Sequence, residues 1–228
     1  MIKCSSGILF KISKIEFLRQ LQNGSVYMNR LDFYTQKENQ TNGDGFLDRE
    51  EGLVCKEVDI TFESNGQKIV FENASACMGM ATPVFCCSRL RIPDMTDGTR
   101  KEINIDPRLI DDFTNGNAAE YGVLFMSKEG FLQRVKDAVE KQNLIYFMGT
   151  VRYKDFENSP ENINDFPKAI FRKNPQYSYQ NEYRIALRKA VIESFRLEIG
   201  DISDISYLGN LEMLRHPIYA EIKEECDS

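Results

Sequence analysis

Histidine and tryptophan are nearly absent from this chain, which has one histidine, His216, and no tryptophan among 228 residues. A site built on several imidazoles therefore cannot exist within one chain, and a Ser-His-Asp triad would have to use His216. That histidine precedes Pro217 near the C-terminus, where we expect a surface or partly packed side chain. A G-x-x-x-x-G-K-[ST] phosphate loop is also missing, which argues against ATP hydrolysis of the usual type.

Long apolar runs and metal-type cysteine pairs are missing as well. No window approaches the roughly 18 apolar residues of a membrane span, and the first apolar stretch is too short for a signal peptide. The six cysteines form no C-x-x-C pair. Cys86 and Cys87 are adjacent in an apolar run, as expected of reduced thiols packed in a strand, whereas a catalytic cysteine would need a cationic neighbour. We expect a cytoplasmic protein with no membrane partner and no metal.

Positive charge is in deficit, with 29 Lys and Arg against 35 Asp and Glu, a net charge of −6. This sign disfavours a protein that coats nucleic acid non-specifically, although a local basic groove is compatible with it. The 42% hydrophobic and 28% charged composition is typical of globular proteins. With no break in composition that would mark a linker, residues 1–228 are expected to form one domain.

The first part of the chain alternates between strand and helix patterns. Residues 7–12 predict a strand, and Ile15, Leu18 and Leu21 recur on one helical face before Gly24, which can end the helix in a left-handed conformation. A second strand is expected over 25–29 and on through Tyr34. The polar, glycine-containing segment 35–52 is expected to be a long functional loop or lid.

Later segments favour antiparallel pairing. Two runs rich in β-branched and aromatic residues, 54–63 and 67–72, flank an Asn-Gly turn, the strongest short-range hairpin signal. A helix is expected after Ser127, and the polar segment 155–175, with its prolines, is expected to be a loop that carries one short helix. Further strands are expected at 83–89, 121–126, 144–153, 180–187, 194–199 and 205–209. The sum is an α+β domain with a mostly antiparallel or mixed central sheet and flanking helices.

The strand expected at 180–187 carries the clearest functional signal. Alternation aims Tyr183, Ile185 and Leu187 into the core, and it places Gln180, Glu182 and Arg184 together on the opposite face. An amide, an acid and a guanidinium would then converge on whatever lies above the sheet. The alternative is a solvated face on which Glu182 pairs with Arg184 or with a neighbouring strand.

Six short motifs, in this order, resemble an uncharacterised bacterial family that is often found near abortive-infection and other phage-defence genes. In this chain they read FLRQLQNGSVYMN, GDGFLDREEG, FCCS, YGVLF, VRY and YQNEYRI. The chain has Gly43-Asp44-Gly45-Phe46 where the family usually has Asn-Asp-Pro-Phe. The resemblance implies a role in conflict between bacteria and phage and implies no particular reaction. It adds Asp44 to the ligand-binding candidates.

A second resemblance points to chemistry. Gln180-x-Glu182, after an aromatic-rich stretch with Tyr179, is similar to the Q-x-E motif of ADP-ribosyltransferases. The resemblance implies that Glu182 bonds the nicotinamide-ribose hydroxyls of NAD and stabilises an oxocarbenium-like transition state, while Gln180 orients the acceptor. Ser88 would correspond to the serine that holds the glutamate, and Lys11 or Arg30 would meet the pyrophosphate. A carboxylate beside developing positive charge is physically suited to that role.

Two classes of function follow from these patterns. One is an NAD-using transferase with Glu182, Gln180 and Ser88 as catalytic residues and with a nucleotide, protein or nucleic-acid acceptor. The other is a non-enzymatic protein that senses or sequesters a phage factor, a host factor or a nucleotide. The position of Glu182 separates them, since an open pocket favours the enzyme and an ion pair on an outer face favours the binding protein. In the acidic loop, Asp44 and its neighbours could bind Ca²⁺ or Mg²⁺, but a solvated loop is the simpler interpretation.

Overall fold

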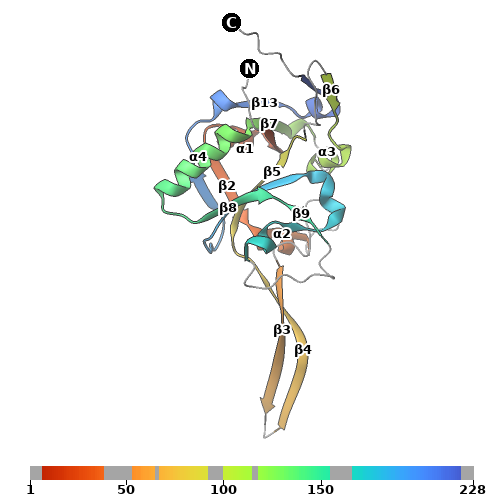
Figure 1. The fold of residues 1–228 in the computed structure, drawn as a ribbon, viewed down its shortest axis with the longest axis vertical. Coiled ribbons are helices and arrows are strands. Elements are labelled where there is room, and N and C mark those ends of the chain that lie inside the picture. Colours follow the sequence, from red (N-terminus) through yellow and green to blue (C-terminus); the bar gives the residue numbers. More distant parts are fainter. Residues whose placement is uncertain are drawn as a thin grey trace.

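An eight-stranded sheet forms the centre of the computed structural model, which describes residues 7–38, 53–64, 67–91, 100–114, 118–154 and 166–221 (Figure 1). Every pairing in this sheet is antiparallel. Six strands follow the order β12 (Phe195–Glu198), β2 (Ser25–Arg30), β5 (Pro83–Arg89), β1 (Ile8–Lys14), β7 (Tyr121–Ser127) and β13 (Ser206–Asn210). The other two are β11 (Glu182–Leu187), which pairs with β5, and β8 (Tyr146–Thr150), which pairs with β11. The predicted α+β class is confirmed.

The sheet divides along one edge of β5. The opposite edge of β5 pairs with β11 without interruption, from Val84 to Ser88. On the divided edge, β2 pairs with Pro83 and Val84, and β1 pairs with Ser88 and Arg89. Neither β1 nor β2 is paired with the stretch between these two contacts in the described register. The strands β1 and β2 therefore separate beside the middle of β5.

One face of the sheet carries the main hydrophobic core. The helices α1 (Ile15–Gln22) and α4 (Lys128–Lys141) cover it, through buried residues such as Leu18 and Phe131. The predicted inward residues of β11, Tyr183, Ile185 and Leu187, belong to this core. Gly24, after α1, has the predicted positive φ of 98°, and an added Cβ would meet the Gly200 carbonyl oxygen at 2.1 Å.

Two smaller clusters cover the second face and leave a space between them. The first contains Phe10 and Ile12 together with residues of α3 (Pro107–Thr114) and η5 (Leu211–Arg215). The second contains Val84 and Ala186 together with residues of α2 (Leu31–Glu38) and α5 (Phe166–Ile170). Because the clusters are separate, the strand face between them is free to line a cavity.

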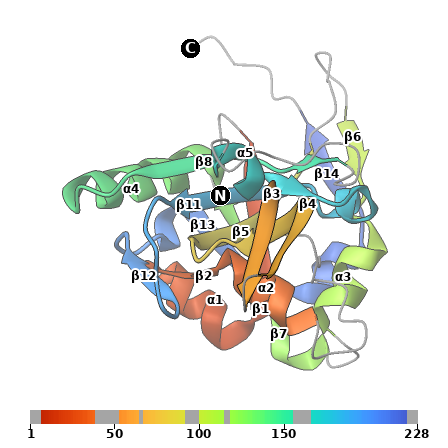
Figure 2. The same ribbon diagram turned by 90° about the horizontal axis from the view of Figure 1, so that it is seen from below.

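A two-stranded ribbon extends away from this body (Figure 1). It consists of β3 (Leu53–Ser64) and β4 (Gln67–Gly79), and Ser64 pairs with Gln67, as the sequence predicts for a hairpin. The second strand is much longer than the expected 67–72. Seen from below, the ribbon projects from the side of the body where β5 and α2 lie (Figure 2).

The remaining elements are short. The strand β6 (Arg100–Ile103) pairs with β14 (Ile218–Glu221), and β9 (Arg152–Tyr153) pairs in parallel with β10 (Arg172–Lys173). Three single-turn segments complete the described chain: η1 (Ala118–Glu120), η3 (Pro175–Gln180) and η4 (Ser203–Ile205). The short helix expected within 155–175 is confirmed as α5, but the strand β10 in the same segment was not predicted.

Two expectations about local structure were wrong. The second strand does not continue through Tyr34, because the chain leaves the sheet after Arg30 and Leu31–Glu38 form α2. Asp32 in the first turn favours a helix here, since an acid there interacts well with the helix dipole. The first four residues of the expected loop 35–52 are therefore helical, and the rest of it lies outside the described residues.

Gln180 was also assigned wrongly to the strand of Glu182. It ends the turn η3, and Asn181, with a φ of 42°, separates it from β11. The left-handed residue reverses the chain between the two positions, so strand alternation does not relate Gln180 to Glu182. The face that carries Glu182 and Arg184 is not solvated either, because the two residues are 6% and 0% exposed.

Candidate functional site

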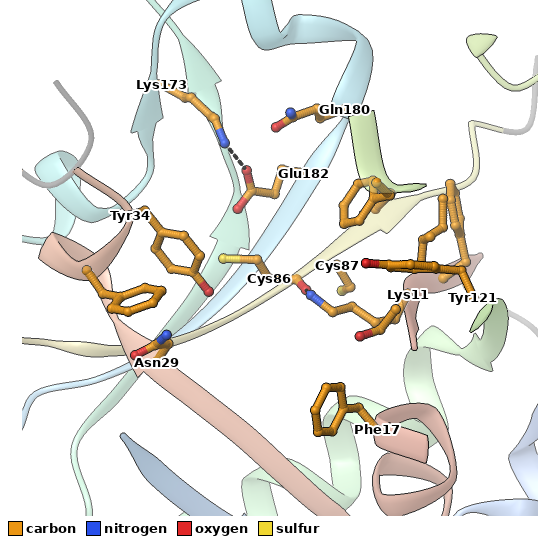
Figure 3. Close-up of a pocket in the computed structure, with 16 residues that line it drawn as sticks. Lys11, Phe17, Asn29, Tyr34, Cys86, Cys87, Tyr121, Lys173, Gln180 and Glu182 are labelled. Atoms are coloured by element: carbon orange, nitrogen blue, oxygen red, sulfur yellow. Dashed lines mark hydrogen bonds and ion pairs between the residues drawn. The ribbon is translucent and has the colours of Figure 1, made fainter. Parts of the chain in front are cut away.

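A cavity of about 410 Å³ lies over the second face of the sheet, beside the separation of β1 and β2 (Figure 3). Strands β5 and β11 contribute residues to it, and so do β1, α1, α2 and the segment 172–182. Its lining consists of Phe10, Lys11, Ile12, Ser13, Phe17, Asn29, Phe33, Tyr34, Cys86, Cys87, Ser88, Phe113, Tyr121, Lys173, Gln180 and Glu182. The volume is within the usual range for small-molecule sites.

Glu182 is the acidic residue of this lining. Its carboxylate accepts hydrogen bonds from Arg184 Nε at 2.6 Å and Arg184 Nη2 at 3.1 Å, one on each oxygen. Lys173 Nζ lies 3.3 Å from the second oxygen, an ion pair drawn in Figure 3. The carboxylate is thus held by two cations and still borders the cavity.

These cations decide the ionisation of Glu182. Burial by itself would raise the pKa of this carboxyl, but the charges of Arg184 and Lys173 and hydrogen bonds from Arg184 and Cys86 outweigh it. The pKa of Glu182 is therefore held well below its ordinary value. The residue is a fixed anion at neutral pH, which suits the stabilisation of a cation and does not suit a general acid.

Arg184 anchors the acid from below. Its side chain is fully buried, and its Nη1 donates to the carbonyl oxygen of Ile170 in α5 at 2.6 Å. It does not line the cavity. Arg184 was expected to bind ligand, but its contacts are those of a positioning residue, because it acts on the cavity through Glu182.

The segment from Lys173 to Glu182 folds into a compact turn that brings its two ends together. Asn174 begins η3 by accepting a hydrogen bond from the Gln176 N–H at 3.1 Å, and Pro175 occupies the first helical position, where its missing N–H costs nothing. Both Gln180 and Lys173 then reach the cavity beside Glu182 (Figure 3). Local turn chemistry thus places an amide, a cation and an anion together.

Tyr153 supports the backbone at the same point. The N–H of Glu182 donates to Tyr153 Oη at 2.8 Å, and the tyrosine is half-buried. Burial, followed by the charge of Glu182, raises the pKa of Tyr153 to about 12, so it stays neutral. Its phenol therefore fixes the start of β11 without adding charge to the site.

Lys11 closes the separation between β1 and β2. Its Nζ donates to the carbonyl oxygen of Cys86 at 2.7 Å, in the part of β5 that neither β1 nor β2 pairs. The ammonium also lies 5.5 Å from the centre of the Phe85 ring. Lys11 was predicted to bind ligand, and the structure places it in the cavity lining with a charge available to an anionic group.

The two adjacent cysteines have different surroundings. Cys87 is buried, and desolvation raises the pKa of its thiol to about 12, so it is an inert core residue. Cys86 is half-buried, lines the cavity and points toward Glu182 (Figure 3). Neither cysteine forms a disulfide, as expected, but only Cys87 is packed in the core.

The other predicted site residues are only partly brought together. Ser88 lies opposite Glu182 in the strand register and lines the cavity. Arg30 is instead bound to Asp32 and to the carbonyl oxygen of Ile192. Tyr179 is stacked by the Arg108 guanidinium, whose centre is 4.3 Å from the ring, and donates its hydroxyl to Asp112. Neither Arg30 nor Tyr179 lines the cavity, and Asp44 lies outside the described residues.

The aromatic wall of the cavity was not predicted. Phe17 of α1 and Phe33 of α2 are 50% and 41% exposed, and Tyr34 and Phe113 line the cavity with them. Such rings can stack on a planar ligand. Phe17 was expected on the apolar face of α1 with Ile15, Leu18 and Leu21, and this was wrong, because Phe17 is exposed whereas Leu18 and Leu21 are buried. Phe33 and Tyr34 were missed as cavity residues because residues 31–34 were assigned to a strand and not to α2.

A second cavity of about 510 Å³ adjoins the first. The two share five lining residues, Lys11, Ser13, Phe17, Tyr34 and Cys86. Its far side carries Tyr27 of β2, with the Arg196 guanidinium 5.3 Å from the ring centre. The described surface therefore provides a long groove with Lys11 near its middle.

Within the described ranges, no three His, Cys, Asp or Glu side chains gather in a group that could hold a metal ion. None of the described helices is long and apolar enough to cross a membrane. A comparison with known proteins found that no family model, no curated protein and no solved structure matches this chain.

Proposed function

We propose that the protein is an NAD-using transferase similar to the ADP-ribosyltransferases, acting in conflict between bacteria and phage. The observation that supports it is a fixed anion, Glu182, at a cavity that also receives Gln180 and Ser88. This arrangement meets the condition for the enzyme and not for an acid on an outer face. The second, adjoining cavity gives room for an elongated substrate.

The chemistry assigned to the site is cleavage of the bond between nicotinamide and ribose. The electron pair of that bond goes to the nicotinamide ring nitrogen, which neutralises its charge and leaves a cation centred on the ribose. Glu182 accepts hydrogen bonds from the ribose hydroxyls and stabilises this cation. The acceptor's nucleophilic atom then forms the new bond to ribose and loses its proton. Gln180 orients the acceptor, and Lys11 faces the pyrophosphate.

The pair of cations beside Glu182 has a cost for this mechanism. Arg184 and Lys173 already neutralise part of the charge that would stabilise the ribose cation. The arrangement favours catalysis because it is rigid. An acid that is held on a strand by three hydrogen-bonding groups does not have to reorganise during the reaction. Cys86 and Cys87, which form no disulfide, fit a reducing cytoplasm, where we place this activity.

The alternative is a binding protein that senses or sequesters a nucleotide without altering it. One observation favours it: both oxygens of the Glu182 carboxylate are occupied by cationic partners. In that case Lys11, Lys173 and the aromatic wall hold the ligand, and Glu182 only orders the two cations.

The test is nicotinamide release, or labelling of protein or nucleic acid acceptors, from purified protein and NAD. Glu182→Gln should lower turnover about a hundredfold or more, because it removes the anion. Glu182→Asp keeps the negative charge but shortens the side chain by one methylene group. This variant should retain more activity than Glu182→Gln. Glu198→Gln, an acid-to-amide change at the exposed end of β12, is the matched control and should change nothing.

Folding of each variant is checked by circular dichroism, since Glu182→Gln leaves two buried cations without their anion. If the wild type binds NAD, as seen by a shift in melting temperature, but releases no nicotinamide with any acceptor class, the sensing function is the correct one. If it neither binds nor cleaves NAD, the transferase proposal is wrong.

A further inference from the structure

The β3–β4 ribbon carries exposed apolar side chains at its outer end. Ile60, Ile69 and Val70 are 38%, 56% and 45% exposed. In the described part of the chain, β3 and β4 pair only with each other, so each has one outer edge with unpaired backbone groups. A two-stranded ribbon is marginally stable alone, and such edges readily pair with another strand.

The register divides the exposed apolar residues of this end between the two faces of the ribbon. Ile60 and Ile69 share one face, because Ile69 pairs with residue 62, two positions from Ile60. Val70, which is opposite Thr61, lies on the other face. A third strand added at either edge would therefore extend the face that carries Ile60 and Ile69.

The sequence of β4 is complementary to itself in the antiparallel direction. From Lys68 to Glu72 it reads Lys-Ile-Val-Phe-Glu. If two copies pair along this edge with Val70 opposite Val70, each Lys68 lies opposite a Glu72 and each Ile69 lies opposite a Phe71. Opposite charges and apolar pairs at facing positions stabilise an antiparallel ladder. Lys68, Val70 and Glu72 are all exposed.

The outer edge of β3 has the reverse property. From Asp59 to Glu63 it reads Asp-Ile-Thr-Phe-Glu. The same centred pairing, on Thr61, would set each Asp59 opposite a Glu63, and like charges at facing positions oppose pairing. The ribbon thus has one edge suited to self-association and one edge that resists it.

A register shift defines the length of the pairing segment. Val58 pairs with Ala74, whereas Ile60 pairs with Phe71, so Glu72 and Asn73 of β4 are opposite the single residue Asp59. This is a β-bulge, and bulges interrupt a regular ladder. The regular ladder of β4 therefore runs from Gln67 to Phe71, and Glu72, the last charge of the self-complementary stretch, is the first residue of the bulge.

We propose that two copies of this chain associate through the outer edges of β4, antiparallel and centred on Val70, to form a four-stranded sheet from two ribbons. The interface is isologous, as in most homodimers. Both cavities lie in the body rather than on the ribbon, so the proposal does not depend on the proposed function.

Sedimentation velocity of the full chain across micromolar concentrations is the first experiment. The wild type should form a dimer. Lys68→Glu should weaken it about tenfold or more, because it replaces two attractive cross-strand pairs by two repulsive ones. The double variant Lys68→Glu with Glu72→Lys exchanges the charges and should restore the dimer.

Two controls separate this register from association through a different edge or a different alignment of the strands. Lys68 is also near Glu63 within the ribbon, at 4.0 Å, so Glu63→Lys creates the same kind of repulsion there but leaves the β4 edge intact, and its dimer should persist. Val70→Cys should form an intermolecular disulfide under oxidation, because facing Cα atoms are about 5 Å apart. Lys68→Cys should not, since its own counterpart is about 13 Å away.

Three results would overturn the proposal. They are a wild type that stays monomeric, a double variant that stays dissociated, and Val70→Cys and Lys68→Cys crosslinking equally.

Discussion

Glu182 and Asp32 are two buried carboxylates that are held in the same way and serve different purposes. Glu182 accepts two hydrogen bonds from Arg184, and Asp32 accepts two from Arg30, at 2.8 and 2.5 Å. In both cases the arginine is two residues away. The acids are equally buried, at 6% exposure each.

Their surroundings differ. Glu182 has a second cation, Lys173, and borders a cavity. Asp32 packs against Gly79 at the base of the ribbon. A Cβ atom added to Gly79 would lie 2.9 Å from the Cβ atom of Asp32. Neither of the two cavities described above includes Asp32. An acid and an arginine two residues apart therefore do not by themselves indicate a functional site. The adjacent cavity and the second cation, Lys173, distinguish Glu182 from Asp32.

The largest expected effect separates the two arginines. Arg184→Met should destabilise the protein by about 3 kcal/mol, because it leaves a buried carboxylate with half its partners. Arg30→Met should cost less, about 1–2 kcal/mol, because the guanidinium that it removes is 28% exposed and water can take its place beside Asp32. Urea unfolding of both variants gives the difference. Equal losses would mean that the two ion pairs are equivalent and that the comparison is mistaken.

A smaller effect tests the second cation. Lys173→Met should cost about 2 kcal/mol of unfolding free energy, because Glu182 keeps Arg184 but loses the charge of a side chain that is 5% exposed. Thermal unfolding is the measurement. Lys136→Met on α4, where the side chain is 49% exposed and pairs at the surface, is the control and should have little effect.

The smallest effect is on pH dependence. The pKa of Glu182 is lowered on folding, so its ion pairs stabilise the protein fully above the unfolded value of about 4.3 and lose their contribution as the pH falls toward the folded value. From about pH 4.5 to 3.5 the wild type should therefore lose about 1 kcal/mol more than Glu182→Gln. Parallel stability curves for the two proteins in this range would show that the pKa of Glu182 is not lowered by folding.

Much of the fold follows from patterns within single segments. The alternation of Tyr183, Ile185 and Leu187 predicts the buried face of β11, and the Asn-Gly pair predicts the β3–β4 hairpin, because both signals depend on neighbours in the sequence. The error at 31–34 arises where the chain leaves a strand, and the error at Gln180 arises where it enters one. Such ends are set by contacts with distant backbone, such as the Leu31 N–H donating to Thr82, which no local pattern contains.

The site was predictable in part for the same reason. Glu182 and Ser88 each stand on a strand with clear alternation, and their shared cavity follows once the strands pair. Lys173 was missed because the polar segment around it gives no sign of the turn that returns it to Glu182. Arg30 and Tyr179 were placed in the site by their charge and ring, but Asp32 and Asp112 bind them elsewhere.

The separation of the sheet beside β5 has a consequence for the order of synthesis. The cavity requires β1, β5 and β11, which are synthesised in that order. The Lys11–Cys86 hydrogen bond alone joins residues 75 positions apart. Contacts between residues so far apart in sequence form slowly, because the chain loses the entropy of a long loop before the contact contributes any stabilising free energy. A nascent chain that has not yet extended past residue 182 has part of the cavity wall without its acid. Any activity of the site therefore begins only after β11 has been synthesised.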